Sequence, residues 1–199
     1  MQTVQLISYS KDYLSNIMGA LGKCYGKKCG VLTLKKSMEA GHLSILEHAY
    51  ATFDIRCSLA VLGQITRHRH FSFTVKSSRG AKFSLDDLYL PDSIDNIADT
   101  HYKEQIYSVI TDYLELINCG VPVEDAAYLL PKGMLTELRI TGNLRAWYEY
   151  LPKRLCERAL PEHRKIAIII QEELESVMPE IFAGVTANCE SCKEAKCKF

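Results

Sequence analysis

The chain of 199 residues has no long apolar run and no excess of charge of either sign. No stretch approaches the roughly 18 apolar residues of a membrane span, and residues 1–10 lack the basic start and apolar core of a signal peptide. We therefore expect a cytoplasmic protein with no membrane partner. Because Lys and Arg together number 24 and Asp and Glu together also number 24, any anion-binding surface has to be a local cluster.

The chain has eight cysteines, a number that could suggest a secreted protein with disulfides. In the absence of a signal peptide we expect reduced thiols and predict no structural disulfide. Cys189, Cys192 and Cys197 have a spacing that could hold zinc or an iron–sulfur cluster if a fourth ligand were supplied. We expect no bound metal and instead predict one domain over residues 1–185, followed by a reduced tail at 186–199; a metal or redox pair in the tail is the alternative.

Hydrophobic periodicity predicts an α+β chain with its strands concentrated in the first half. Strands are expected at residues 4–8 and 49–58, an extended segment at 83–90 and a turn at 22–28. Helices are expected at residues 11–21, 32–40, 59–67, 102–118, 122–130, 144–151 and 161–178. Gly41 is expected to cap the helix before it, and Ser44 and Glu47 are expected to form a capping box in a short helix or turn.

The most informative segment is the basic stretch at residues 67–79, R-H-R-H-F-S-F-T-V-K-S-S-R. It combines four fixed cations, two imidazoles and four hydroxyl side chains within thirteen residues. Guanidinium groups bind phosphate through paired N–H donors, and serine hydroxyls add neutral donors. The segment therefore predicts a site for a phosphorylated ligand, although composition alone leaves a solvated basic loop as an alternative.

This stretch resembles the signature R-H-R-x-x-S-x-N-x-x-S-x-R of the flavin-dependent thymidylate synthases. Six of its seven fixed positions match, and Thr74 replaces the asparagine. Further similarity to the family lies in the segments at 22–25, 42–48 and 141–145, and at Gln64, Leu130, Pro131, Thr136, Glu137 and Arg154. The resemblance thus covers nearly the whole chain.

The resemblance implies a helix-rich fold around a central antiparallel sheet and a homotetramer with shared active sites. It implies a methyltransferase that moves a methylene group from methylenetetrahydrofolate to C5 of dUMP, using FAD and NADPH, with no nucleic-acid partner. The implied flavin contacts are Ser44, Glu47, Arg67, His68, Arg69, Asn143 and Arg145. The implied nucleotide contacts are Gln64, Ser77, Ser78, Arg79 and Arg154. Arg154 is the expected catalytic residue, because a fixed cation at the uracil ring stabilises charge that develops there.

Taken alone, several of these residues have simpler explanations. Ser44 and Glu47 could merely cap a helix, and Asn143 is an ordinary N-cap residue. An arginine such as Arg154 is more often a surface residue. Cys156 lies close enough in sequence to suggest a thiolate nucleophile, but a packing role is the simpler interpretation.

Several departures from the family pattern concern the nucleotide. Thr74, Val75, Gly80 and Ala127 replace an asparagine, an acidic residue, an aromatic residue and an arginine, and Leu160 and Pro161 replace a glutamine-containing stretch. Two alternatives to a dUMP enzyme therefore stay open. One is a flavoprotein that acts on UMP or another uridine nucleotide. The other is a nucleotide-binding or RNA-binding protein without catalysis, which would stack bases on Phe71 and Phe73.

Overall fold

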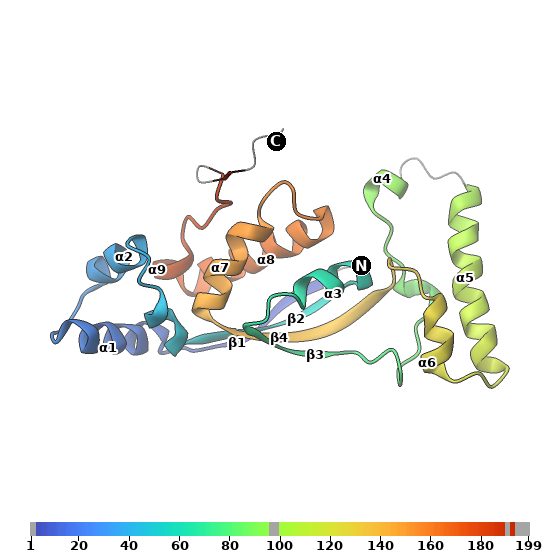
Figure 1. Cartoon of the computed structure of the whole chain (residues 1–199), viewed down its shortest axis with the longest axis horizontal. Coiled ribbons are helices and arrows are strands. Elements are labelled where there is room, and N and C mark those ends of the chain that lie inside the picture. Colours follow the sequence, from blue (N-terminus) through green and yellow to red (C-terminus); the bar gives the residue numbers. More distant parts are fainter. Residues whose placement is uncertain (1–2, 96–99, 190–191, 194–199) are drawn as a thin grey trace. The chain divides into compact units, whose positions relative to one another are not determined.

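The structure is a computed structural model that describes residues 3–95, 100–189 and 192–193 (Figure 1). The strands are β1 (Thr3–Tyr9), β2 (Tyr50–Ser58), β3 (Phe71–Val75) and β4 (Leu135–Asn143). The helices are α1 (Tyr13–Tyr25), α2 (Val31–Glu39), α3 (Leu59–Ile65), α4 (Asp92–Asp95), α5 (Thr100–Asn118), α6 (Val123–Ala126), α7 (Leu144–Arg154), α8 (Pro161–Val177) and α9 (Pro179–Phe182). Short 3-10 turns are η1 (Ser44–His48), η2 (Leu85–Asp87) and η3 (Ala127–Leu129). Among the described residues, no helix has the length and apolar character needed to cross a bilayer.

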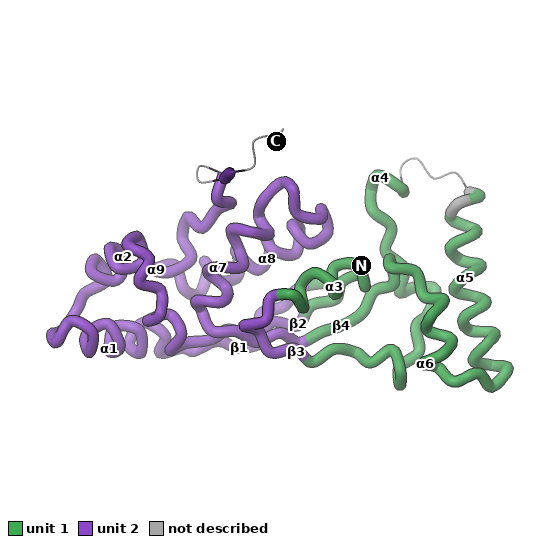
Figure 2. The backbone as a smooth tube through the Cα atoms, in the orientation of Figure 1, with its two compact units in different colours: residues 1–3, 55–67, 74–138 green, residues 4–54, 68–73, 139–199 purple. Residues whose placement is uncertain are grey.

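The chain divides into two compact units (Figure 2). Unit 1 comprises residues 1–3, 55–67 and 74–138, and unit 2 comprises residues 4–54, 68–73 and 139–199. All four strands begin in one unit and end in the other. The single domain predicted at 1–185 stays a prediction.

The four strands form one antiparallel sheet in the order β1-β2-β4-β3. The register of β2 and β4 is set by the Leu144 N–H, which donates to the Ala49 carbonyl at 2.9 Å, and by the Leu59 N–H, which donates to the Met134 carbonyl at 2.9 Å. Because the partner number falls as the residue number rises, the pair is antiparallel. This arrangement confirms the α+β fold and the antiparallel sheet that the sequence predicts.

Two of the four strands, β3 and β4, were not predicted. The expectation that strands are concentrated in the first half is confirmed for the described residues, because β1, β2 and β3 lie there and only β4 lies in the second half. In β4, buried Leu138 and Ile140 alternate with exposed Glu137 and Arg139, which is the period of a half-buried strand. This alternation was present in the sequence. The segment at 83–90, expected to be extended, contains the 3-10 turn η2 and only an isolated bridge at Leu88.

The helix ends show which turn predictions hold. Helix α1 continues through Tyr25, so the turn expected at 22–28 begins too early, and Gly26 ends the helix with a φ of 66°. Gly41 has a φ of 81°, and its N–H donates to the Met38 carbonyl, which confirms it as the cap of α2.

The capping box expected at Ser44 and Glu47 was wrong. Ser44 is the first residue of η1, and no side chain caps this turn. The residue at the N-cap position is Leu43, one residue before Ser44, and its backbone angles are already helical, with φ at −90° and ψ at −8°. An N-cap residue usually has an extended backbone and a side-chain oxygen that accepts from the first turn, and Leu43 has neither. Ser44 therefore does not cap this turn.

Unit 1 has its own apolar core, to which α5 contributes two buried residues. Phe83, Ile110, Tyr113 and Met134 are all buried in this cluster. The Tyr113 hydroxyl accepts a hydrogen bond from the Phe83 N–H at 3.3 Å, so the buried polar atom is satisfied. This core supports the segment that follows the basic stretch.

Unit 2 is built around Trp147, whose indole N–H donates to the Ala51 carbonyl at 3.1 Å. The Phe71 ring packs on it with ring centroids 4.4 Å apart. A Cβ added at Gly142 would lie 2.2 Å from the Phe71 ring, so only glycine allows this approach. Gly142 immediately precedes Asn143, the N-cap of α7, so this close approach lies directly beside the junction of β4 and α7.

Candidate functional site

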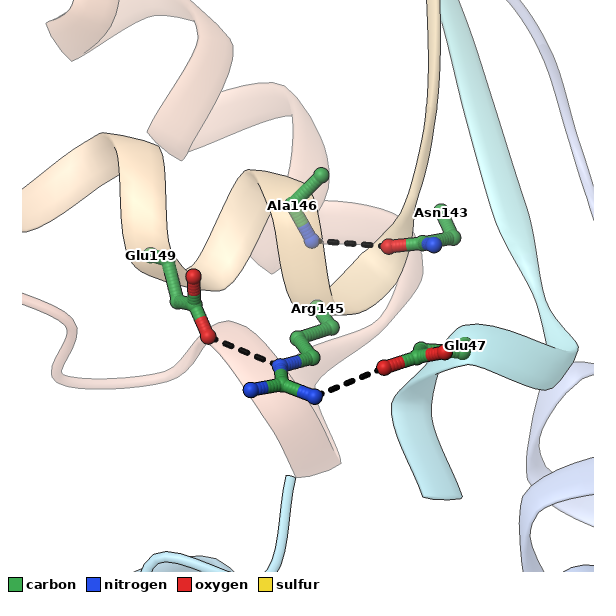
Figure 3. Close-up of polar contacts among 5 residues, drawn as sticks. All are labelled: Glu47, Asn143, Arg145, Ala146 and Glu149. Atoms are coloured by element: carbon green, nitrogen blue, oxygen red, sulfur yellow. Dashed lines mark hydrogen bonds and ion pairs between the residues drawn. The ribbon is translucent and has the colours of Figure 1, made fainter. Parts of the chain in front are cut away.

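The junction between β4 and α7 brings three predicted residues together in unit 2 (Figure 3). Asn143 caps α7, because its Oδ1 accepts from the Ala146 N–H at 2.8 Å. Two residues into the helix, Arg145 donates from Nη1 to Glu47 Oε1 at 2.7 Å and from Nε to Glu149 Oε1 at 2.8 Å. Asn143, Arg145 and Glu47 therefore lie in one cluster, and their role as flavin contacts stays a prediction.

Glu149 was missed by the sequence analysis. It lies four residues after Arg145, a spacing that places two side chains on one helix face, so a signal for the pair existed. The hydrogen bonds from Arg145 to Glu149 and to Glu47 raise the pKa of the guanidinium above its ordinary value. One cation held between two carboxylates leaves a net negative cluster, which suits a ligand with both hydrogen-bond donors and acceptors better than a phosphate.

A second pair joins the basic stretch to the end of α7. The Arg154 Nε donates to His68 Nε2 at 2.9 Å. Because Nε2 accepts this bond, the proton of the neutral imidazole lies on Nδ1. Burial, followed by the charges of Arg154 and Lys153, lowers the pKa of His68 to about 4. The ring is therefore neutral near pH 7, and Arg154 is paired with an uncharged acceptor.

Behind this pair lies a buried tyrosine–histidine contact that sequence reasoning did not find. The Tyr150 hydroxyl and His163 Nε2 are 2.9 Å apart. Burial, followed by the charges of Arg154 and His68, lowers the pKa of His163 to about 3. No local pattern predicts this contact, because it depends on the packing of α8 against α7.

The predicted nucleotide residues lie mainly in the turn after β3, in unit 1. The Ser77 Oγ accepts from the Arg79 N–H at 3.2 Å, which leaves its own O–H able to donate. Ser78 is half-buried beside it. Arg79 donates from Nε to Glu124 Oε2 at 2.8 Å, and its side chain is 80% exposed. Gln64 is half-buried in α3, three residues before Arg67.

Three predicted flavin contacts have no protein partner in the part of the chain that the structure describes. Ser44, Arg67 and Arg69 are exposed, and their side chains make no hydrogen bond or ion pair with a described residue. Arg67 and Arg69 thus offer fixed charges that no described carboxylate neutralises. Such cations suit an anionic group of a ligand.

Two residues that departed from the family pattern or invited a catalytic role have ordinary surroundings. Ala127 is partly buried against the unit 1 core, where it packs in place of the expected arginine. Cys156 is half-buried in the turn after α7, where its carbonyl accepts from the Ala159 N–H. Cys197, one of the three tail thiols, lies outside the described residues.

Comparison with known proteins gives a consistent family assignment. A family model described as "Thymidylate synthase complementing protein" matches residues 5–180. A flavin-dependent thymidylate synthase of Sulfurisphaera tokodaii is 39% identical over 153 residues, covering 75% of this chain and 59% of that protein. The enzyme of the same name from Saccharolobus solfataricus is 38% identical over 154 residues, covering 75% and 58%. That of Sulfolobus acidocaldarius is 33% identical over 204 residues, covering 94% and 77%. The chain therefore matches under two thirds of the length of the first two relatives.

Proposed function

This chain belongs to the flavin-dependent thymidylate synthase family, and we propose that it is an FAD-dependent methyltransferase that converts dUMP to dTMP. In this proposal methylenetetrahydrofolate provides the one-carbon unit and NADPH provides the reducing equivalents. The observation that supports it most is the hydrogen bond between His68 and Arg154. It joins a residue of the basic signature to the expected catalytic arginine, which lies 86 residues later in the chain.

The described residues fit a flavin as ligand. Flavin offers carbonyl and hydroxyl acceptors together with N–H and O–H donors, and it supplies the redox chemistry when bound. Glu47 and Glu149 can accept from its donors, while Arg145 can donate to its acceptors. We assign the anionic pyrophosphate to Arg67 and Arg69, because the Arg145 cluster is net negative.

We assign charge stabilisation on the uracil ring to Arg154. Its Nε is occupied by His68, so the two Nη groups are the donors left for a ligand. Since the His68 imidazole is neutral, it orients the guanidinium without cancelling its charge. A preorganised cation of this kind favours the electron-rich form of the base and stabilises negative charge in the transition state.

We assign the nucleotide phosphate to the turn at 77–79, with Gln64 as a further contact. The Ser77 hydroxyl can donate, and the Arg79 guanidinium can pair with phosphate oxygens. The Glu124 carboxylate accepts from the Arg79 Nε, as a phosphate oxygen would. A bound nucleotide and Glu124 therefore either share the Arg79 guanidinium or compete for it. Ser77 acts as a donor and not as a nucleophile.

We further propose the homotetramer with shared active sites that the family implies, a cytoplasmic location and no nucleic-acid partner. The family likeness supports the tetramer. Its mass in solution, measured by light scattering after gel filtration, tests it: a monomer at assay concentration would contradict the shared sites.

The visible spectrum and a substrate panel test the proposal. Purified protein should absorb near-ultraviolet and blue light and should form dTMP from dUMP when methylenetetrahydrofolate and NADPH are added. A colourless protein that binds nucleotide would refute the enzyme and indicate a binding protein. Turnover with UMP but not with dUMP would identify the related activity that the changes at Thr74, Val75 and Ala127 leave open.

A further inference from the structure

A buried hydrogen-bonded pair lies behind the proposed active site and contains no predicted ligand contact. His163 is 0% exposed and Tyr150 is 1% exposed, and His163 Nε2 lies 2.9 Å from the Tyr150 hydroxyl. A hydroxyl and an imidazole are costly to bury unless they bond to each other or to other groups. An apolar core would need neither, so the pair requires an explanation beyond packing.

The Tyr150 ring is held on several sides. The Phe71 and Trp147 rings each form a T-shaped contact with it, at interplanar angles of 86° and 89° and centroid distances of 5.7 and 5.6 Å. Its hydroxyl is fixed by His163 on α8. A ring that is packed on its flanks and bonded at its tip has little freedom to tilt.

His68 lies against this ring. The His68 and Tyr150 centroids are 4.9 Å apart and their planes meet at 76°. In addition, His68 Nε2 accepts from the Arg154 Nε. Tyr150 and Arg154 are one helical turn apart on α7, so a single helix presents both the supporting ring and the guanidinium.

We propose that Tyr150 and His163 are positioning residues for Arg154. His163 fixes the Tyr150 hydroxyl, the Tyr150 ring sets the orientation of His68, and His68 Nε2 holds the guanidinium in place for the nucleotide. This inference rests on the proposed function, in which Arg154 acts on the uracil ring. It requires a neutral His68, because only the unprotonated Nε2 can accept from an arginine.

The decisive variant is Tyr150→Phe, which keeps the ring and removes the hydroxyl. We expect kcat to fall roughly ten- to a hundredfold, as small misplacements of catalytic groups do, with flavin content unchanged. Tyr148→Phe is the matched control, since Tyr148 is on the same helix but packs on Phe182, with centroids 6.5 Å apart, whereas the described ring contacts of His68 are with Phe71 and Tyr150. His163→Leu should resemble Tyr150→Phe, whereas His163→Gln, which can still bond the hydroxyl, should restore much of the lost kcat.

Ring nitrogen NMR of His68 gives a readout that does not require turnover. We expect the Nδ1–H form in the unmodified protein and a mixture of the two neutral tautomers in Tyr150→Phe. Unchanged kcat and an unchanged His68 spectrum in Tyr150→Phe would overturn the inference, as would an equal loss of kcat in Tyr148→Phe.

The positioning role and the proposed function fail in different ways. If the unmodified protein neither holds flavin nor forms dTMP, the proposed function fails, while the His68 spectrum still reports whether Tyr150 orients the ring. If Tyr150→Phe does not fold, judged by its melting curve, His163→Gln and His163→Leu carry the comparison. Equal kcat in these two folded variants would then refute a role for the hydrogen bond.

Discussion

Two arginines that we assign to the nucleotide lie in contrasting surroundings. Arg154, in unit 2, is partly buried and donates to a neutral imidazole, whereas Arg79, in unit 1, is 80% exposed and pairs with the Glu124 carboxylate. A partly buried cation beside an uncharged acceptor keeps its full charge for a ligand. Because water screens a partly buried charge less, its attraction to a negative group of the ligand is stronger. The field of an exposed, paired cation is cancelled in part and screened by salt. This contrast supports our assignment of charge stabilisation to Arg154 and of the weaker task of phosphate binding to Arg79.

The largest effect is expected from Arg154→Ala. Loss of one preorganised donor at a site of developing charge costs about 10²–10³ in rate, so dTMP formation should fall by that factor. Flavin should stay bound, because the flavin contacts lie on other residues. Steady-state kinetics and the flavin spectrum of the same sample check both parts.

Cys156→Ser is the control for this variant. Cys156 lies two residues after Arg154, but we give it a packing role, so its replacement should change turnover little. Abolished turnover in Cys156→Ser together with full activity in Arg154→Ala would instead support a thiolate nucleophile.

A smaller effect is expected at the flavin. Arg67 has no ionic partner among the described residues, so its charge is available to the pyrophosphate. A charge-assisted bond of this kind contributes roughly 1.5–3 kcal/mol, and Arg67→Ala should weaken FAD binding about ten- to a hundredfold. Arg139→Ala is a matched control, because Arg139 is already paired with Asp54. Normal FAD retention in Arg67→Ala, measured by fluorescence titration, would refute the assigned role.

Two imidazoles of unit 2, those of buried His163 and half-buried His68, make stability depend on pH. Their ordinary pKa is 6.5, and in the folded protein it is lowered to about 4 for His68 and about 3 for His163. Below pH 6.5 the unfolded chain takes up protons that the folded chain does not, so stability falls as pH falls. The loss is at most about 1.4 kcal/mol per pH unit for each group and less for the partly exposed His68.

Urea unfolding at a series of pH values from about 7.5 down to about 5 measures this dependence, because most carboxylates titrate below this pH range. His163→Leu should reduce the slope of unfolding free energy against pH, because one buried imidazole is removed. His70→Leu, a change at an exposed histidine, should leave the slope as it was. Equal slopes in the unmodified protein and in His163→Leu would contradict the buried neutral ring.

The comparison also shows which parts of the site could be predicted from the sequence. The longer helices of both units were predicted because their apolar periodicity is local, whereas the four-residue helices α4 and α9 were not predicted. Strand β4 was missed although Leu138 and Ile140 alternate with charged residues. β3 was missed because its polar face, with Ser72 and Thr74 exposed, made the whole stretch look like a ligand-binding loop. In both strands the pattern was present and was given too little weight.

The partners of the two arginines were not predictable in the same way. Arg154 and His68 are separated by 86 residues, and Arg79 and Glu124 by 45. Their pairing depends on tertiary packing, which no local spacing encodes. The family likeness could name Arg154 and Arg79, but it could not say that one has a neutral partner and the other an acidic one.

The smallest effect, and the sharpest test of the contrast, is expected at Glu124. If its carboxylate competes with the nucleotide phosphate, Glu124→Gln should tighten dUMP binding about two- to fivefold at low salt, as the modest energy of an exposed pair allows. Arg79→Ala should weaken binding by a similar factor, and in the double variant the effect of Glu124→Gln should largely vanish, because the arginine that Glu124 pairs with is gone.

Asp125→Asn is the matched control, because it removes the same charge from the neighbouring residue, and it should tighten binding less. If Asp125→Asn tightens binding equally, the cause is the general field of the surface. If Glu124→Gln instead weakens binding, Glu124 orients Arg79 for the phosphate. Arg79 would then be preorganised by its carboxylate partner, as Arg154 is by the His68 imidazole.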